Sequence, residues 1–97
     1  MAKLSGVERY LYNGLKAQAI VEREVLQLLR DRRATVPDKA MTLGEIQLAL
    51  YEQQAGKINI KRVGPAAEDL AIRDLVRQPG AARYFISQKG QQLLRGH

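Results

Sequence analysis

One stretch near the C-terminus decides the fold: Arg83-Tyr84-Phe85-Ile86-Ser87-Gln88-Lys89-Gly90. Its first four residues favour a short strand, in which Tyr84 and Ile86 share one face and Phe85 takes the other. Residues 78–82, which contain a Pro-Gly pair, precede this strand and are typical of a hairpin tip. Ser87 can accept a hydrogen bond from an early backbone N–H of a following helix. We therefore predict a β-hairpin that leads into a short terminal helix.

The segment before the hairpin, residues 66–77, is predicted to be a helix. Gly64-Pro65 indicates its start, because a proline at the first helical position gives up an N–H that has no partner there anyway. Helical spacing predicts core-facing residues at Ala67, Leu70, Ala71 and Leu75. The residues expected partly or wholly on the outside are Glu68, Asp69, Ile72, Arg73 and Val76.

Another helix is predicted to begin after Thr42. The run Thr42-Leu43-Gly44-Glu45 has the spacing of a capping box, and Met41 can pack against Ile46 as a hydrophobic staple. Polar and apolar residues then alternate over residues 57–61, which predicts a short strand or an extended turn. A further short strand is considered at residues 35–36. These elements connect the second helix to the segments on either side of it.

The N-terminal part is predicted to hold two helices. A capping-box spacing at Ser5-Gly6-Val7-Glu8 indicates the first, and Asn13-Gly14 is expected to end it, because both residues tolerate the left-handed conformation. A longer helix is predicted over residues 15–32 from an apolar stripe formed by Ala17, Ile20, Val21, Val25, Leu28 and Leu29. We therefore divide the chain into an N-terminal helix at residues 1–14 and one domain at residues 15–97.

The order of three helices, a hairpin and a final helix resembles the winged helix-turn-helix superfamily over residues 17–94. The stretch 83–90, followed by Leu93-Leu94, is similar to the wing ending of many bacterial regulators, where an aromatic strand reaches a Ser/Thr cap and then a Lys-Gly pair. Residues 41–46 look like the start of the first helix of the turn motif. The resemblance implies a mainly α, α+β fold: a three-helix core with a C-terminal β-hairpin wing, an extra N-terminal helix and a short C-terminal helix.

The resemblance also implies double-stranded DNA binding, sequence-specific or nonspecific, by a small transcriptional regulator or a plasmid or phage protein. The helix at residues 66–77 would lie in or across the major groove, and the wing at residues 78–83 would touch phosphate or the minor groove. Arg73 and Arg77 can reach phosphates or guanine edges. The phosphate candidates are Lys57, Lys61, Arg62, Arg83 and Lys89. For each of these cations, a merely solvated surface charge is the alternative.

The charge distribution agrees with a basic C-terminal surface. The net charge is +6, and residues 56–97 hold eight Lys/Arg against three Asp/Glu, whereas residues 1–55 hold eight against seven. A cationic surface attracts phosphate backbones, although it also attracts membranes and acidic proteins.

Two features depart from the family pattern. The connection at residues 56–63 is longer than the usual tight turn, and Glu68-Asp69 places negative charge on the first turn of the reading helix. Either that helix docks through Arg73 and Arg77, or the domain contacts proteins instead.

Composition excludes several classes of function. The 97 residues fit a single domain, no cysteine is present, and His97 is the only histidine, so neither a multi-His metal site nor a His-based nucleophile can form within one chain. No phosphate-loop or dinucleotide motif occurs. We predict no enzymatic activity, no cofactor, no metal and no small-molecule substrate. Because no signal-peptide or membrane-spanning run is found, we expect a soluble, cytoplasmic protein that does not bind membranes.

The extra N-terminal helix offers spare apolar surface for a homodimer, since many small DNA readers bind palindromic half-sites as two-fold dimers. The predicted interface residues are Leu4, Val7, Tyr10, Leu11 and Leu15. Alternatively, these residues cover the core of their own domain. The main rival to DNA binding is a protein interaction module, whose patch would consist of Ile72, Val76, Tyr10 and Tyr12.

Overall fold

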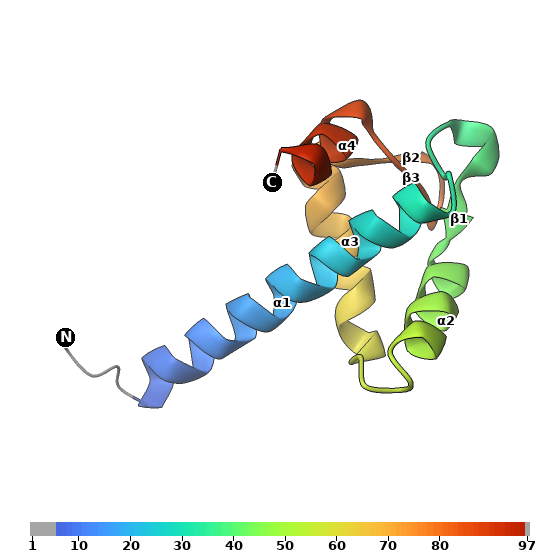
Figure 1. Ribbon diagram of the computed structural model, residues 1–97. Coiled ribbons are helices and arrows are strands. Elements are labelled where there is room, and N and C mark those ends of the chain that lie inside the picture. The colour runs from blue at the N-terminus through green and yellow to red at the C-terminus, as the bar shows by residue number, and fades with distance from the viewer. Residues whose placement is uncertain (1–5, 97) are drawn as a thin grey trace.

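The structure is a computed structural model that describes the backbone of residues 6–96 and the side chains of residues 16–96. Within that part, four α-helices and three short strands form a mixed α+β fold (Figure 1). Two single-turn 3-10 helices, η1 (Pro37–Lys39) and η2 (Ile60–Arg62), lie in the connections. The main elements are α1 (Gly6–Asp31), β1 (Met41–Thr42), α2 (Leu43–Gln53), α3 (Val63–Ile72), β2 (Val76–Gly80), β3 (Arg83–Ile86) and α4 (Gln88–Arg95).

The three strands form one antiparallel sheet in the order β1-β3-β2. The predicted hairpin is formed by β2 and β3, with Val76 opposite Ile86, but its tip is shorter than predicted, because residues 78–80 belong to β2 and the turn occupies residues 81–82. Tyr84 and Ile86 are both buried while Phe85 is half-buried, as the strand alternation predicted. The hairpin tip is held down, because the Leu43 N–H donates to the Ala82 carbonyl over 2.7 Å.

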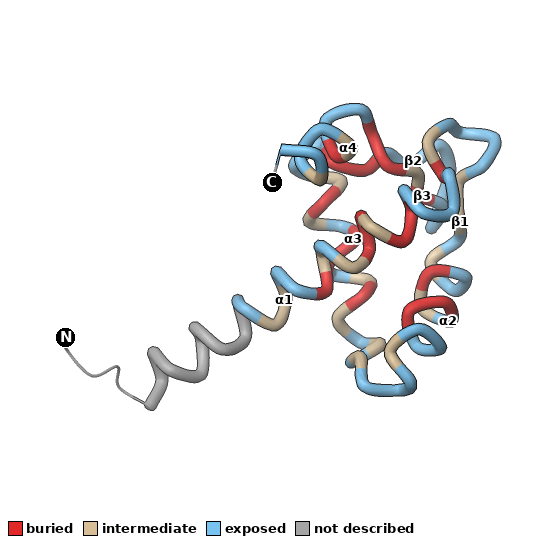
Figure 2. Tube along the Cα trace, in the orientation of Figure 1, coloured by how far each residue is buried: buried red, intermediate tan, exposed pale blue. Residues whose placement is uncertain are grey.

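One apolar core joins α1, α2, α3 and the hairpin (Figure 2). The fully enclosed side chains come from every one of these elements. Most of this cluster lies on the C-terminal half of α1 and on the faces of α2 and α3 that meet it. The largest of them are Leu28, Leu29, Ile46, Leu50, Leu70 and Ile86.

Two helix starts are confirmed as predicted. The Thr42 hydroxyl accepts from the Glu45 N–H over 3.1 Å, and the Glu45 carboxylate accepts from the Thr42 N–H over 2.9 Å, which completes a capping box at α2. The Ser87 hydroxyl accepts from the Gly90 N–H over 3.1 Å at the start of α4. The same hydroxyl donates to the Asp74 carbonyl, so it also ties α4 to the end of α3.

The predicted helix end at Asn13-Gly14 is wrong, because α1 runs without a break from Gly6 to Asp31. Glycine weakens a helix interior by only about 1 kcal/mol, which strong helix formers on either side can offset. The predicted boundary between residues 14 and 15 therefore falls inside a single helix. The apolar stripe of α1 also differs from the prediction, since Ile20 is 54% exposed and Leu26 is buried.

The helix predicted over residues 66–77 is also wrong at its end, because α3 stops at Ile72. The chain turns at Asp74, whose φ is 62°, while the Leu75 N–H donates to the Leu70 carbonyl and closes the end of the helix. Val76, predicted outside, is buried because it begins β2 and pairs with Ile86.

The strands predicted in the connections are not formed. Of the short strand or extended turn predicted for residues 57–61, the strand is not formed, because residues 57–59 are irregular and residues 60–61 belong to η2. Residues 35–36 are also irregular. Besides β2, the strand that pairs with β3 is β1, which follows η1. Among the helices that the structure describes, none is long and apolar enough to cross a membrane.

Candidate nucleic-acid interface

The central element of the predicted interface, α3, carries no cation within its bounds. Its ten residues, Val63-Gly64-Pro65-Ala66-Ala67-Glu68-Asp69-Leu70-Ala71-Ile72, include two carboxylates and neither Lys nor Arg. Ala66, Ala67 and Leu70 face the core, whereas Glu68 and Ile72 are exposed one turn apart. Ile72 is 83% exposed, the largest value among the exposed large hydrophobic residues that are described. The free face of α3 is therefore acidic and apolar.

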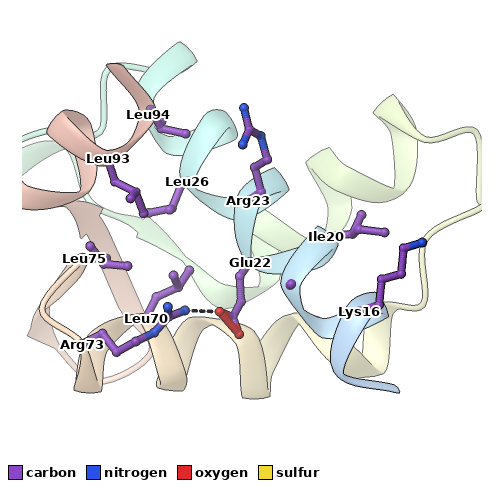
Figure 3. A pocket seen from close by; sticks show the side chains of 11 residues that line it. Lys16, Ile20, Glu22, Arg23, Leu26, Leu70, Arg73, Leu75, Leu93 and Leu94 are labelled. Atoms are coloured by element: carbon purple, nitrogen blue, oxygen red, sulfur yellow. Dashed lines mark hydrogen bonds and ion pairs between the residues drawn. The ribbon is translucent and has the colours of Figure 1, made fainter. Parts of the chain in front are cut away.

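Arg73 caps the C-terminus of α3 and turns back toward α1. Its guanidinium forms an ion pair with the Glu22 carboxylate (Figure 3). A second ion pair joins it to Asp69 at 3.1 Å. Burial raises the pKa of the Glu22 carboxyl, and the charge of Arg73 partly offsets that effect. Because both of its ionic partners are on the protein, Arg73 fastens α3 to α1.

Arg77, which the sequence placed on the reading helix, lies instead on β2. Its guanidinium forms an ion pair with Asp74 at 3.4 Å, and its side chain is exposed. Lys89, in the first turn of α4, donates to the Arg73 carbonyl over 3.3 Å. The end of α3 thus gathers three of the predicted cations, Arg73, Arg77 and Lys89.

Arg83 lies apart from that group, at the start of β3 and directly opposite Thr42 in the sheet register. Its side chain is exposed, and no ion pair is found for it within the described residues. The hydrogen bond from the Thr42 N–H lowers the pKa of Glu45, and the charge of Arg83 adds a smaller effect of the same sign. Arg83 is therefore near the N-terminus of α2, next to the hairpin tip.

The remaining predicted cations lie in the connection before α3. Lys61 lies in η2 and is exposed, and its backbone N–H donates to the Asn59 side-chain oxygen over 3.1 Å. Lys57 and Arg62 line a hollow of about 260 Å³ between this connection and α1. Lys57, Lys61 and Arg62 thus form a second cationic group, on the N-terminal side of α3.

The seven predicted DNA-binding residues consequently occupy three places: the connection before α3, the C-terminal end of α3 with the adjoining starts of β2 and α4, and the start of β3. They flank α3 rather than lie on it. One member, Arg73, has two ionic partners on the protein, which the sequence did not reveal because Glu22 lies 51 residues earlier in the chain. No local pattern in the sequence distinguishes Glu22 from an ordinary surface charge.

The predicted dimer residues cannot be placed in the same way. Leu4 precedes the described residues, and the side chains of Val7, Tyr10, Leu11 and Leu15 are also outside the described part, although their backbone belongs to α1. The predicted protein-interaction patch is wrong at Val76, which is buried, whereas Ile72 is exposed. The side chains of Tyr10 and Tyr12 lie outside the described part.

Within the part of the chain that is described, no group of three or more His, Cys, Asp or Glu side chains is arranged to hold a metal ion. Comparison of the whole chain with protein-family models, with curated proteins and with solved structures gives no match.

Proposed function

We propose that this protein is a winged-helix DNA-binding protein that holds duplex DNA mainly by its phosphates. The observation that carries the proposal is the element order α1-β1-α2-α3-β2-β3 together with the sheet order β1-β3-β2. This arrangement is the one expected for a helix-turn-helix followed by a wing. In such folds the helix corresponding to α3 approaches the major groove, and the hairpin lies beside the backbone.

The positions of the cations support phosphate contacts from both sides of α3. Lys57 and Lys61 precede the helix, and Arg83 lies at the base of the hairpin tip. Contacts of this kind fix the position of a protein on the duplex without reading its sequence. We do not propose Arg73 as a DNA contact, because Glu22 and Asp69 already neutralise the charge of its guanidinium.

The free face of α3 limits the kind of base reading that we expect. Glu68 can accept a hydrogen bond from the amino group of cytosine, and Ile72 can pack against the methyl group of thymine. Guanine reading by an arginine of α3 is not available, because the helix has no arginine. The proposed preference is thus modest and directed to pyrimidines on one strand.

Salt dependence of binding to a random duplex tests the proposed function. Fluorescence anisotropy at about 50 and 200 mM salt is expected to show affinity that falls steeply, because each neutralised phosphate releases a bound counterion. Absence of binding even at low salt would contradict the proposal. The Arg30→Ala variant is the control for net charge. It removes one positive charge from α1, the helix that packs against the buried face of α3.

A specific observation favours the protein-interaction alternative. The helices α2 and α3 together carry Glu45, Glu52, Glu68 and Asp69 and no Lys or Arg, and they expose Leu48 and Ile72. Carboxylates repel phosphate, whereas an apolar and acidic face suits a basic protein partner. If the folded protein does not bind the random duplex even at low salt, binding to a protein partner replaces DNA binding as the proposed function.

A further inference from the structure

A groove of about 400 Å³ lies between α1, the end of α3 and α4 (Figure 3). Its apolar lining includes Leu26, Leu70, Leu75 and Leu94. Two further apolar residues at its edge remain in contact with water, since Ile20 is 54% exposed and Leu93 is 42% exposed. Single exposed apolar residues are common on protein surfaces, but an apolar hollow with exposed apolar edges is typical of an interaction site.

The face of α1 that lines this groove continues toward the N-terminus of the same helix. Lys16, Ala19, Arg23 and Leu26 line the groove at intervals of three and four residues. The same spacing, followed backward through the sequence of α1, reaches Leu15, Tyr12 and Glu8. Figure 1 shows α1 extending well past the other elements on this side. At 1.5 Å per residue, the ten steps from Gly6 to Lys16 span about 15 Å.

We propose that a second copy of this chain covers the groove, with its α1 running antiparallel to the first α1. A two-fold axis near residues 15 and 16 brings the N-terminal turns of each α1 into the groove of the other copy, so that both grooves are filled by identical contacts. The inference does not depend on DNA binding. It concerns the side of the molecule formed by α1 and α4 rather than the free face of α3.

Charge complementarity selects the register of this pair. Lys16 and Arg23 are exposed at the rim of the groove, and neither has an ionic partner among the residues whose side chains are described. Glu8 is the single acidic residue of segment 1–15. When Tyr12 of one copy is set opposite Ala19 of the other, Glu8 comes opposite Arg23 four residues further along. The small Ala19 side chain leaves room there for the tyrosine ring.

Sedimentation analysis gives the first test of the proposal. At tens of micromolar, the wild-type protein is expected to sediment as a dimer of two 10.9 kDa chains. Leu93→Glu places a charge in the covered groove and is expected to weaken the dimer roughly hundredfold. The matched control is Leu48→Glu on α2, which is 60% exposed outside the groove and should leave the dimer intact. A monomeric wild type, or equal effects of the two variants, would overturn the proposal.

Cysteine pairing gives the second test, because the natural chain has no cysteine. The Glu8→Cys and Arg23→Cys proteins carry different tags and are mixed under mild oxidation. A disulfide between the two introduced cysteines is expected to link chains that carry different tags. Arg30→Cys in place of Arg23→Cys moves the thiol seven residues, or about 10.5 Å, along α1 and should pair far less. Equal pairing by both thiols would refute the register. Circular dichroism confirms that each variant is folded, and random-duplex binding is measured separately, so loss of the dimer and loss of DNA binding are distinguished.

Discussion

Gly90 stands where the start of α4 meets the loop that follows α3. A Cβ at this position would overlap the Leu75 carbonyl oxygen and lie 2.8 Å from Ile86 Cγ1. The constraint comes from backbone packed against backbone, because the Leu75 carbonyl also accepts the Ser87 N–H. In the Lys89-Gly90 pair, which resembles a wing ending, close packing against Leu75 thus requires a glycine at position 90.

Gly90→Ala is expected to destabilise the protein by about 1–3 kcal/mol, because the new methyl group must push the start of α4 away from the Leu75 carbonyl and the Ile86 side chain. Chemical denaturation followed by circular dichroism measures this change. Gly44→Ala is the matched control, since a Cβ at Gly44 has no atom within 4 Å and alanine favours the helix. Equal stability of the Gly90 variant and the wild type would show that this contact is absent.

Ile72 is the residue through which the proposed base reading can be tested most directly. If its side chain packs on a thymine methyl group, replacing that thymine by deoxyuridine in a selected site should weaken binding about fourfold, the value of one buried methyl group. The Ile72→Ala variant should bind both duplexes equally. Anisotropy titrations of two proteins against two duplexes provide the measurement. A uridine effect that persists in Ile72→Ala would assign the methyl contact to another residue.

At the scale of elements, three helices end in the same way without a glycine. Arg33, Ala55 and Asp74 each adopt a positive φ at the end of α1, α2 and α3, with values of 58°, 52° and 62°. In each case the N–H of the next residue donates to a carbonyl five residues earlier, at Leu29, Tyr51 and Leu70. This closure normally uses glycine, for which the left-handed conformation is free of strain.

Ala55→Gly is therefore expected to stabilise the protein by up to about 1 kcal/mol, by relieving the left-handed alanine at the end of α2. Ala19→Gly, in the interior of α1, is the opposite control and should destabilise by about 1 kcal/mol. Thermal unfolding of the two variants beside the wild type measures both effects. If Ala55→Gly were the less stable of the two, the helix end would have a different backbone conformation.

The junction between α1 and α3 should respond to pH through Glu22. Burial raises the pKa of this carboxyl in the folded protein above its unfolded value, so its contribution to stability is complete at low pH and is lost as pH rises through the folded pKa. Relative to Glu22→Gln, the wild type should lose stability as pH increases from about 4 toward neutrality. Denaturation midpoints over that range provide the test.

The Arg73→Ala variant checks the cause of this pH effect. Without the guanidinium, the pKa of Glu22 should rise further, because only burial and the neighbouring Asp69 carboxylate remain to act on it. The loss of stability with pH should then extend to higher pH than in the wild type. An unchanged profile would mean that the ion pair between α1 and α3 does not form in solution.

At the scale of the whole molecule, the cations form two groups separated by an acidic helix, with Arg83 apart at the hairpin. The triple variant Lys57→Ala, Lys61→Ala, Arg83→Ala should reduce the salt slope of binding to random duplex by about 2.7, because each phosphate contact contributes about 0.9. Arg73→Ala should change the slope little, since that charge is neutralised within the protein. Equal slopes for the triple variant and the wild type would place the DNA on another face.

Local signals in the sequence predicted several features correctly. The capping box at Thr42, the cap at Ser87 and the alternation of Tyr84, Phe85 and Ile86 all depend on contacts within a few residues. The interruption of α1 was predicted wrongly, because the helix formers around Asn13-Gly14 outweigh that pair. The end of α3 was predicted wrongly, because Asp74 is not a usual helix terminator. Propensity is a weak guide where an unusual backbone conformation is held by tertiary packing.

What the sequence determined by itself is the α+β class, the presence of a hairpin, the starts of α2 and α4 and the excess of positive charge toward the C-terminus, since each follows from short-range patterns or from composition. Only the tertiary structure decided that Arg73 is bound to Glu22, that Arg77 lies on a strand, and that a groove opens between α1 and α4. These facts join residues far apart in the chain. Their free energies depend on how helices pack, and no local spacing along the sequence contains that information.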